Sequence, residues 1–151
     1  MHESAASVTI RKSVTVDVSL ETAFRVFTEE IAAWWPLATK SVGQENAVTL
    51  VIEPRVGGRV YEQVRSGEEH DWGEVLAWEP PRRLVFSWHP GRGTETGQEV
   101  EVTFAATGDR TLVELEHRGW ERLVATADEI PEHYESGWDE VMERFAEAAS
   151  G

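Results

Sequence analysis

The strongest constraint on this chain is a period-two alternation of apolar and polar residues that fills its middle. Successive side chains of a strand point to opposite faces of a sheet, so this alternation predicts strands with one buried face. Short clusters of turn residues separate the runs, and Gly57-Gly58 is a hairpin signal because glycine tolerates positive φ. The short turns indicate one antiparallel sheet. Its predicted strands here are Ala47–Glu53, Arg59–Arg65, His70–Glu79, Arg83–His89, Glu99–Ala105 and Thr111–His117.

A further strand and helical segments precede this region. Val8–Val18 also alternates, with β-branched residues on the even positions. Ser19 then stands where a helix N-cap belongs, and apolar residues follow at helical spacing from Leu20 to Ile31. A break near Glu29-Glu30 predicts two short helices, and Pro36 ends the helical character.

The last segment of the chain is predicted to be an amphipathic helix. A sheet of seven strands must bury one face, and this helix is the only predicted element large enough to cover it. Val113 and Leu115 alternate with Glu114 and Glu116, so His117 shares the inward parity. We therefore predict one α+β domain over residues 1–151. The apolar stripe of the helix is Tyr134, Trp138, Val141, Met142, Phe145 and Ala149.

Charge and composition exclude several classes of protein. The formal net charge of −14 argues against a nucleic-acid partner or an anionic membrane surface, since either requires a basic face. The absence of cysteine excludes disulfides, thiolate metal sites and cysteine catalysis. No apolar run is long enough to cross a membrane, and the N-terminus lacks the pattern of a signal peptide. A cytoplasmic protein without a cofactor is the expectation.

Two stretches of the sequence resemble a known superfamily. They are Val56–Glu62, with Gly57-Gly58, and Trp72–Trp88, with Trp78-Glu79-Pro80-Pro81. With Gly137-Trp138 of the last helix, they are similar to the SRPBCC superfamily, in the branch related to the activator of heat-shock protein 90 ATPase. This resemblance implies a START-like, Bet-v-1-like helix-grip fold, in which a curved sheet wraps a long helix and leaves an apolar cavity. Members include lipid and hormone binders, aromatic cyclases and co-chaperone domains.

Seven tryptophans are the sharpest compositional signal for a site. Their large apolar faces could line a ligand cavity, or they could be core residues of a curved sheet. Adjacent residues of a helix point about 100° apart, so we expect only one of Trp34 and Trp35 to pack into the core. The other would face the cavity mouth or a second copy of the chain, which suggests a homodimer. The predicted ligand-binding residues are Trp34, Trp35, Tyr61, Glu62, Trp72, Trp88, His117, Tyr134 and Trp138.

The polar candidates depend on which face of each strand is buried. Glu62 and Glu74 lie in strands between apolar residues, and either one could serve as acid, base or polar anchor if it faces inward. Tyr61 and Arg59 have the opposite parity to Glu62, so one set or the other should line the cavity. The five histidines show no metal-ligand spacing, and His117 is expected to be a core histidine. No metal site and no catalytic residue is assigned.

The sequence is compatible with three functions. The first is binding of a small hydrophobic molecule between the sheet and the last helix. The second is a chaperone-associated domain, which the branch resemblance implies. The third is an enzyme of the polyketide cyclase type, which would need an inward acid–base pair such as His117 with Glu62 or Tyr61.

Overall fold

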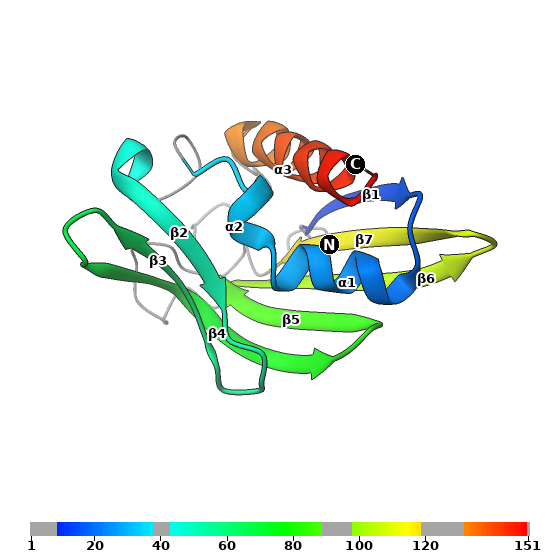
Figure 1. Cartoon of the computed structure of the whole chain (residues 1–151), viewed down its shortest axis with the longest axis horizontal. Coiled ribbons are helices and arrows are strands. Elements are labelled where there is room, and N and C mark those ends of the chain that lie inside the picture. The colour runs from blue at the N-terminus through cyan, green and yellow to red at the C-terminus, as the bar shows by residue number, and fades with distance from the viewer. Residues whose placement is uncertain (1–8, 38–42, 89–97, 119–131, 151) are drawn as a thin grey trace, which may run out of the picture.

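A computed structural model describes residues 9–37, 43–88, 98–118 and 132–150 of the chain. These ranges form seven strands and a long C-terminal helix, with two short helices after the first strand (Figure 1). The elements are β1 (Thr9–Val16), α1 (Leu20–Thr28), α2 (Ile31–Trp34), η2 (Gln44–Asn46), β2 (Ala47–Ile52), β3 (Arg59–Val64), β4 (Glu69–Glu79), β5 (Arg83–Trp88), β6 (Gln98–Thr107), β7 (Arg110–Arg118) and α3 (Glu132–Ser150).

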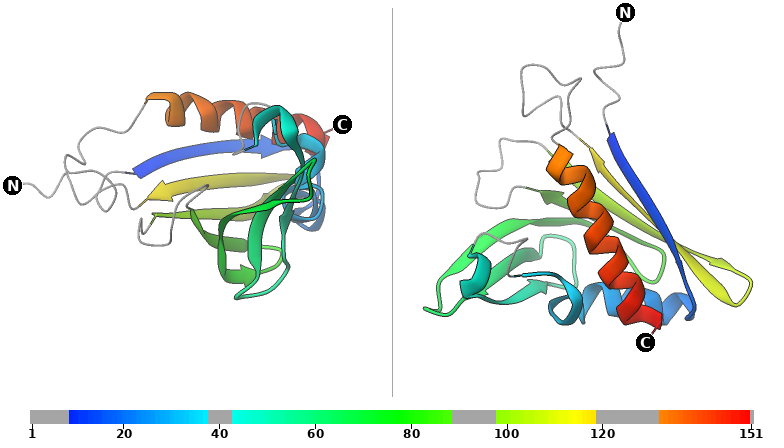
Figure 2. Two further views of the ribbon diagram at one scale, coloured as in Figure 1. Left: turned by 90° about the vertical axis from the view of Figure 1, so that its left-hand side faces the viewer. Right: turned by 90° about the horizontal axis from the view of Figure 1, so that it is seen from above.

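All neighbouring strands are antiparallel, in the order β1-β7-β6-β5-β4-β3-β2. The strand β1 closes the meander by pairing with β7, where Val14 faces Val113. The sheet curls, and α3 crosses one of its faces (Figure 2). This arrangement confirms the predicted fold class, a seven-stranded antiparallel sheet with a long helix packed on it.

The sequence signals that predicted the start of α1 and the break between α1 and α2 are confirmed. The Ser19 hydroxyl accepts a hydrogen bond from the Thr22 N–H at 3.2 Å, which caps α1. The break near Glu29-Glu30 is present, since α1 ends at Thr28 and α2 begins at Ile31. Trp35, directly after α2, has extended backbone angles (φ −66°, ψ 132°). The chain has therefore left the helix one residue before Pro36.

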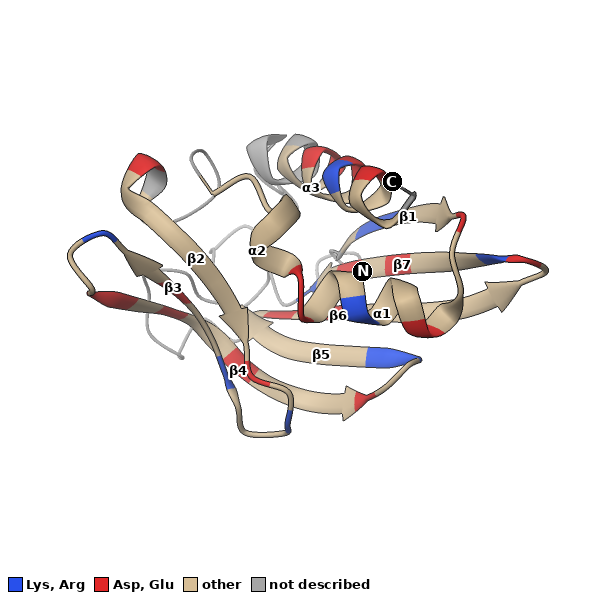
Figure 3. Cartoon of the chain, in the orientation of Figure 1, with Lys and Arg blue, Asp and Glu red and all other residues tan. Residues whose placement is uncertain are grey.

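The two faces of the sheet differ as the alternation predicted. In β6 and β7 the apolar side chains are buried on the inner face, where Phe104 contacts Phe24 and Phe27 of α1, while the carboxylates between them lie on the outward face. There Arg118 contacts Glu99, Glu101 and Glu116 at 2.7–3.4 Å. Acidic residues are spread over several strands and over α1 and α3 (Figure 3).

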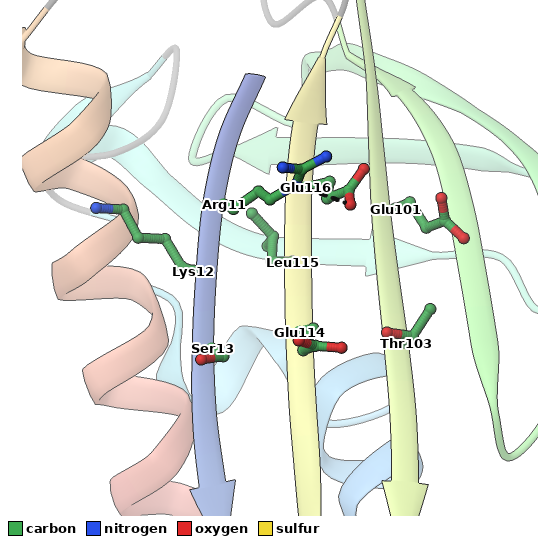
Figure 4. A pocket seen from close by; sticks show the side chains of 8 residues that line it. All are labelled: Arg11, Lys12, Ser13, Glu101, Thr103, Glu114, Leu115 and Glu116. Carbon is green, nitrogen blue, oxygen red and sulfur yellow. Dashed lines mark hydrogen bonds and ion pairs between the residues drawn. The ribbon is translucent and has the colours of Figure 1, made fainter. Parts of the chain in front are cut away.

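A groove of about 430 Å³ lies on this outward face, over β1, β7 and β6 (Figure 4). Its lining is mostly polar, and the ion pair between Arg11 and Glu116 crosses it at 3.1 Å. Burial raises the pKa of Glu101 in this groove, but the hydrogen bonds from Arg83 and Arg118 outweigh that effect and the pKa is lowered overall. A site for an apolar molecule is therefore to be sought on the other face.

The strand β4 links the two halves of the sheet. The first half of this strand pairs with β3 and its second half with β5, and each ladder contains a register shift. Gly73 lies where the two halves meet, and a Cβ atom there would collide with the backbone carbonyl of Ser87. The neighbouring Glu74 N–H donates to the Ser87 hydroxyl at 2.8 Å. Glycine thus allows the close approach of β4 to β5.

We predict that Gly73→Ala destabilises the protein by about 2–3 kcal/mol, because backbone atoms must move to admit the methyl group. Urea unfolding of the two proteins gives the difference in the free energy of unfolding. Leu76→Ala is the control, since Leu76 lies on the same strand but is 42% exposed. It should cost less than about 1 kcal/mol, and equal stability of Gly73→Ala and wild type would contradict this account of the strand.

Candidate functional site

Four tryptophans from four parts of the chain meet between the sheet and α3. We call Trp35, Trp72, Trp88 and Trp138 the tryptophan cluster; they follow α2, and lie on β4, β5 and α3. The centroid distances are 5.3 Å for Trp35–Trp72, 5.6 Å for Trp72–Trp88 and 5.2 Å for Trp88–Trp138, and Trp35 also contacts Trp138 at 5.9 Å. Each of the four is less than 10% exposed. The rings form one continuous aromatic surface inside the protein.

The strand register explains why these side chains converge. Trp88 is the last residue of β5, and its cross-strand partner Gln98 is the first residue of β6. His117, near the end of β7, is paired with Val100 of β6. Trp88 and Trp138 both contact the His117 ring, at 5.7 and 5.8 Å. The cluster therefore lies at the end of the sheet where β5 and β7 end and β6 begins.

Trp34 borders the cluster, with its ring 5.9 Å from that of Trp35, but its other contacts lie outside the cluster. Its ring contacts Phe27 at 5.3 Å and Phe145 at 5.4 Å, and its indole N–H donates to the Val26 carbonyl at 2.8 Å. Trp34 and Trp35 are only 4% and 7% exposed. The prediction that one of this pair is exposed as a contact for a second copy is wrong. The reason is the extended backbone of Trp35, which directs its ring into the cluster instead of along the helix surface.

His117 is fully buried and hydrogen-bonded at both ring nitrogens. The Trp138 indole N–H donates to Nδ1 at 3.0 Å, and Nε2 lies 2.6 Å from the Gln98 Oε1. Burial lowers the pKa of His117 to about 3. At neutral pH it is therefore an uncharged imidazole that joins α3 to β6 and β7.

Glu62 is the second titratable group that the described residues bury completely. Its Oε1 accepts the Trp72 indole N–H and its Oε2 accepts the Gly43 backbone N–H, both at 2.7 Å. Hydrogen bonds of this kind make a buried carboxylate tolerable. Glu62 thus anchors one tryptophan of the cluster and the start of the turn that leads into β2.

The other polar candidates lie on the outer face of the sheet. The strand β3 alternates, with Val60, Glu62 and Val64 buried. Tyr61 points the other way and carries the Arg59 guanidinium 4.1 Å above its ring. Glu74 is exposed. Glu62 therefore lies on the inner face of the sheet and Tyr61 on the outer face, so Tyr61 does not reach the cluster.

The side chain of one predicted residue lies outside the part that the structure describes, and two residues of the site were not predicted from the sequence. Tyr134 lies in α3, but its side chain is not among those described. Gln98 shares the parity of the inward Val100 and could have been found from it, whereas nothing in the sequence marks Gly43 as a donor to Glu62.

No three or more metal-ligating side chains come together in the ranges that the structure describes. Within the same ranges, no helix has the length and apolar content needed to cross a membrane.

Solved structures share this fold over nearly the whole chain. The Aha1 dimer from Colwellia psychrerythraea is 16% identical, with a TM-score of 0.68, and the match covers 95% of this chain and 96% of that one. Protein MLL2253 from Mesorhizobium loti is 19% identical, with a TM-score of 0.66 and coverage of 92% and 94%. At this level of identity the likeness shows the fold alone.

A third solved structure is closer in sequence. The anthrahydroquino-gamma-pyrone synthase Txn09, complexed with SUM, is 30% identical, with a TM-score of 0.60 and coverage of 95% and 97%. No curated protein sequence matches the chain.

A family model also matches most of the chain. The model of the Activator of Hsp90 ATPase homolog 1-like protein matches residues 17–150, from the end of β1 through α3. This range contains all four residues of the tryptophan cluster together with Glu62 and His117. The chain therefore belongs to the family of Activator of Hsp90 ATPase homolog 1-like proteins, within the SRPBCC, START-like superfamily.

Proposed function

We propose that this protein binds a small, mainly apolar molecule between the curved sheet and α3, at the tryptophan cluster. The observation that carries the proposal is the convergence of Trp35, Trp72, Trp88 and Trp138 on the inner face of the sheet, with two buried polar groups at their edges. Ligand sites in proteins combine apolar and aromatic walls with a few placed polar groups. The cluster has that composition.

The polar groups strengthen this interpretation. Aliphatic side chains fill a core without polar atoms, so a core built only for packing has no need of a carboxylate or an imidazole. Here Glu62 and His117 are fully buried, and each requires hydrogen bonds to offset the loss of water. They hold the indoles of Trp72 and Trp138 in fixed orientations. Fixed aromatic walls favour a rigid, planar ligand, since little side-chain freedom is lost on binding.

A synthase acting on aromatic compounds is the second candidate function. The observation that favours it is the 30% identity to the synthase Txn09 over 95% of the chain. Of the described buried groups, only Glu62 and His117 could transfer a proton. His117 is held by two partners and its pKa is about 3, so it makes a poor general base at neutral pH. In such a reaction Glu62 would be the proton-transferring group.

Chaperone activation remains a prediction that the family description suggests. Addition of the protein to Hsp90 would raise the rate of ATP hydrolysis in that case. An unchanged rate would leave the binding function as the one to pursue.

The binding proposal is tested by native mass spectrometry of the purified protein with a panel of fused-ring aromatic ketones and of fatty acids, followed by titration of the best binder. We predict that Trp88→Leu weakens binding about tenfold or more, because Trp88 contacts three other rings of the site. The matched control is Trp78→Leu, since Trp78 contacts Phe24 outside the cluster. Binding by neither class of compound, or equal losses in the two variants, would contradict the proposal.

The state of His117 gives a prediction about pH. A histidine with a pKa of about 3 in the folded protein and about 6.5 when unfolded takes up its proton only on unfolding between these values. Stability contributed by this group is therefore complete above pH 6.5 and is lost as the pH falls toward 3. Between pH 6.5 and pH 5.0 the loss is about 1.5 kcal/mol.

Urea unfolding at these two pH values measures this loss. His117→Gln removes the titrating group while keeping an amide that can hydrogen-bond to Trp138 or Gln98. We expect the wild type to lose about 1.5 kcal/mol more than this variant. Parallel pH dependence in the two proteins would show that His117 is not held neutral.

A further inference from the structure

The hydrogen-bond chain through His117 has a fixed direction because it begins at an indole. The tryptophan N–H can donate a hydrogen bond but cannot accept one. Trp138 therefore donates to Nδ1 of His117, which must be the unprotonated nitrogen of the neutral ring. The proton of the ring is on Nε2, which donates to the Gln98 Oε1 at 2.6 Å.

This direction also fixes the orientation of the Gln98 amide. Because Oε1 faces His117, the Nε2 amide group with its two N–H donors is turned away from the ring. Gln98 is only 4% exposed and lies on the inner face of β6, in line with Val100. In the part of the chain that the structure describes, the hydrogen bond of the Gln98 side-chain amide is the one from His117 to its Oε1. The two Nε2 donors, which are not fully enclosed, can bond an acceptor on a bound molecule.

We propose that Gln98 determines the specificity of the site by donating a hydrogen bond from Nε2 to a carbonyl, quinone or phenolate oxygen of the ligand. The inference rests on the proposed function and names the class of molecule that it concerns: planar aromatic compounds that carry such an oxygen. Trp88 is the cross-strand partner of Gln98, so the oxygen would lie beside a ring of the cluster. His117 and Trp138 act as positioning residues that keep the Gln98 amide in this orientation.

A matched pair of probes tests the assignment. Fluorene and 9-fluorenone share one planar ring system. The bridging carbon is a CH2 group in fluorene and a carbonyl in 9-fluorenone. We expect the wild type to bind 9-fluorenone roughly three- to tenfold more tightly, as titrated by tryptophan fluorescence. In Gln98→Met the preference should vanish while the affinity for fluorene is kept. Gln98→Glu should also lose it, because a carboxylate accepts from His117 but donates nothing to the ligand.

The positioning role has its own readout. Trp138→Phe keeps an aromatic ring but removes the indole donor, so the His117 tautomer and the Gln98 amide are no longer fixed. We expect the preference for 9-fluorenone to fall in this variant. In the wild-type protein without ligand, the 15N chemical shifts of the His117 ring should report a proton on Nε2, a measurement that needs no variant to fold.

The outcomes separate this inference from the proposed function. Equal affinity of the wild type for the two probes would leave the binding function standing and overturn the role of Gln98. A proton on Nδ1 of His117 would overturn it as well. Binding of neither probe would contradict the proposed function and this inference together, and a preference that persists in Gln98→Met would assign the donor to another residue.

Discussion

The hydrogen bond from the Trp138 indole to His117 connects the two layers of this protein in its buried interior. It joins α3 to β7 at 3.0 Å, and through Gln98 it extends to β6. Both partners contact Trp88, so the same contact also orders the tryptophan cluster. A helix held only by apolar packing could slide along the sheet, whereas this bond sets one position and one orientation of the Trp138 ring. The interior surface that we assign to a ligand depends on that position.

The two faces of the sheet perform different tasks because their side chains alternate. The outer face carries Arg83, Arg118 and their carboxylate partners, which remain in contact with water and contribute modestly to stability. Among the described residues, most carboxylates thus lie on exposed or half-buried strand and helix surfaces, and the inner face keeps only Glu62 as a fully buried one. This separation lets an acidic protein present an aromatic interior.

The sequence allowed the layers to be predicted, but not every contact in the site. The parity of Val113 and Leu115 places His117 inside, and the alternation of β3 leaves two choices, of which the structure selects Glu62. Trp35 was misjudged because helical spacing was extended one residue beyond the helix, to a position with extended backbone angles. The bend of β4 at Gly73 and the donation from Gly43 to Glu62 depend on how strands approach in three dimensions, and no local pattern encodes them.

The central claim is that the tryptophan cluster is the wall of a ligand site. Two-dimensional 1H–15N spectra of the indole N–H groups test it most directly during titration with a planar aromatic ketone. We predict that the signals of Trp72 and Trp138, which bond to Glu62 and His117, shift with saturation. Trp78, which contacts Phe24 outside the cluster, should stay in place. A shift confined to Trp78, with Trp72 and Trp138 unchanged, would contradict the claim.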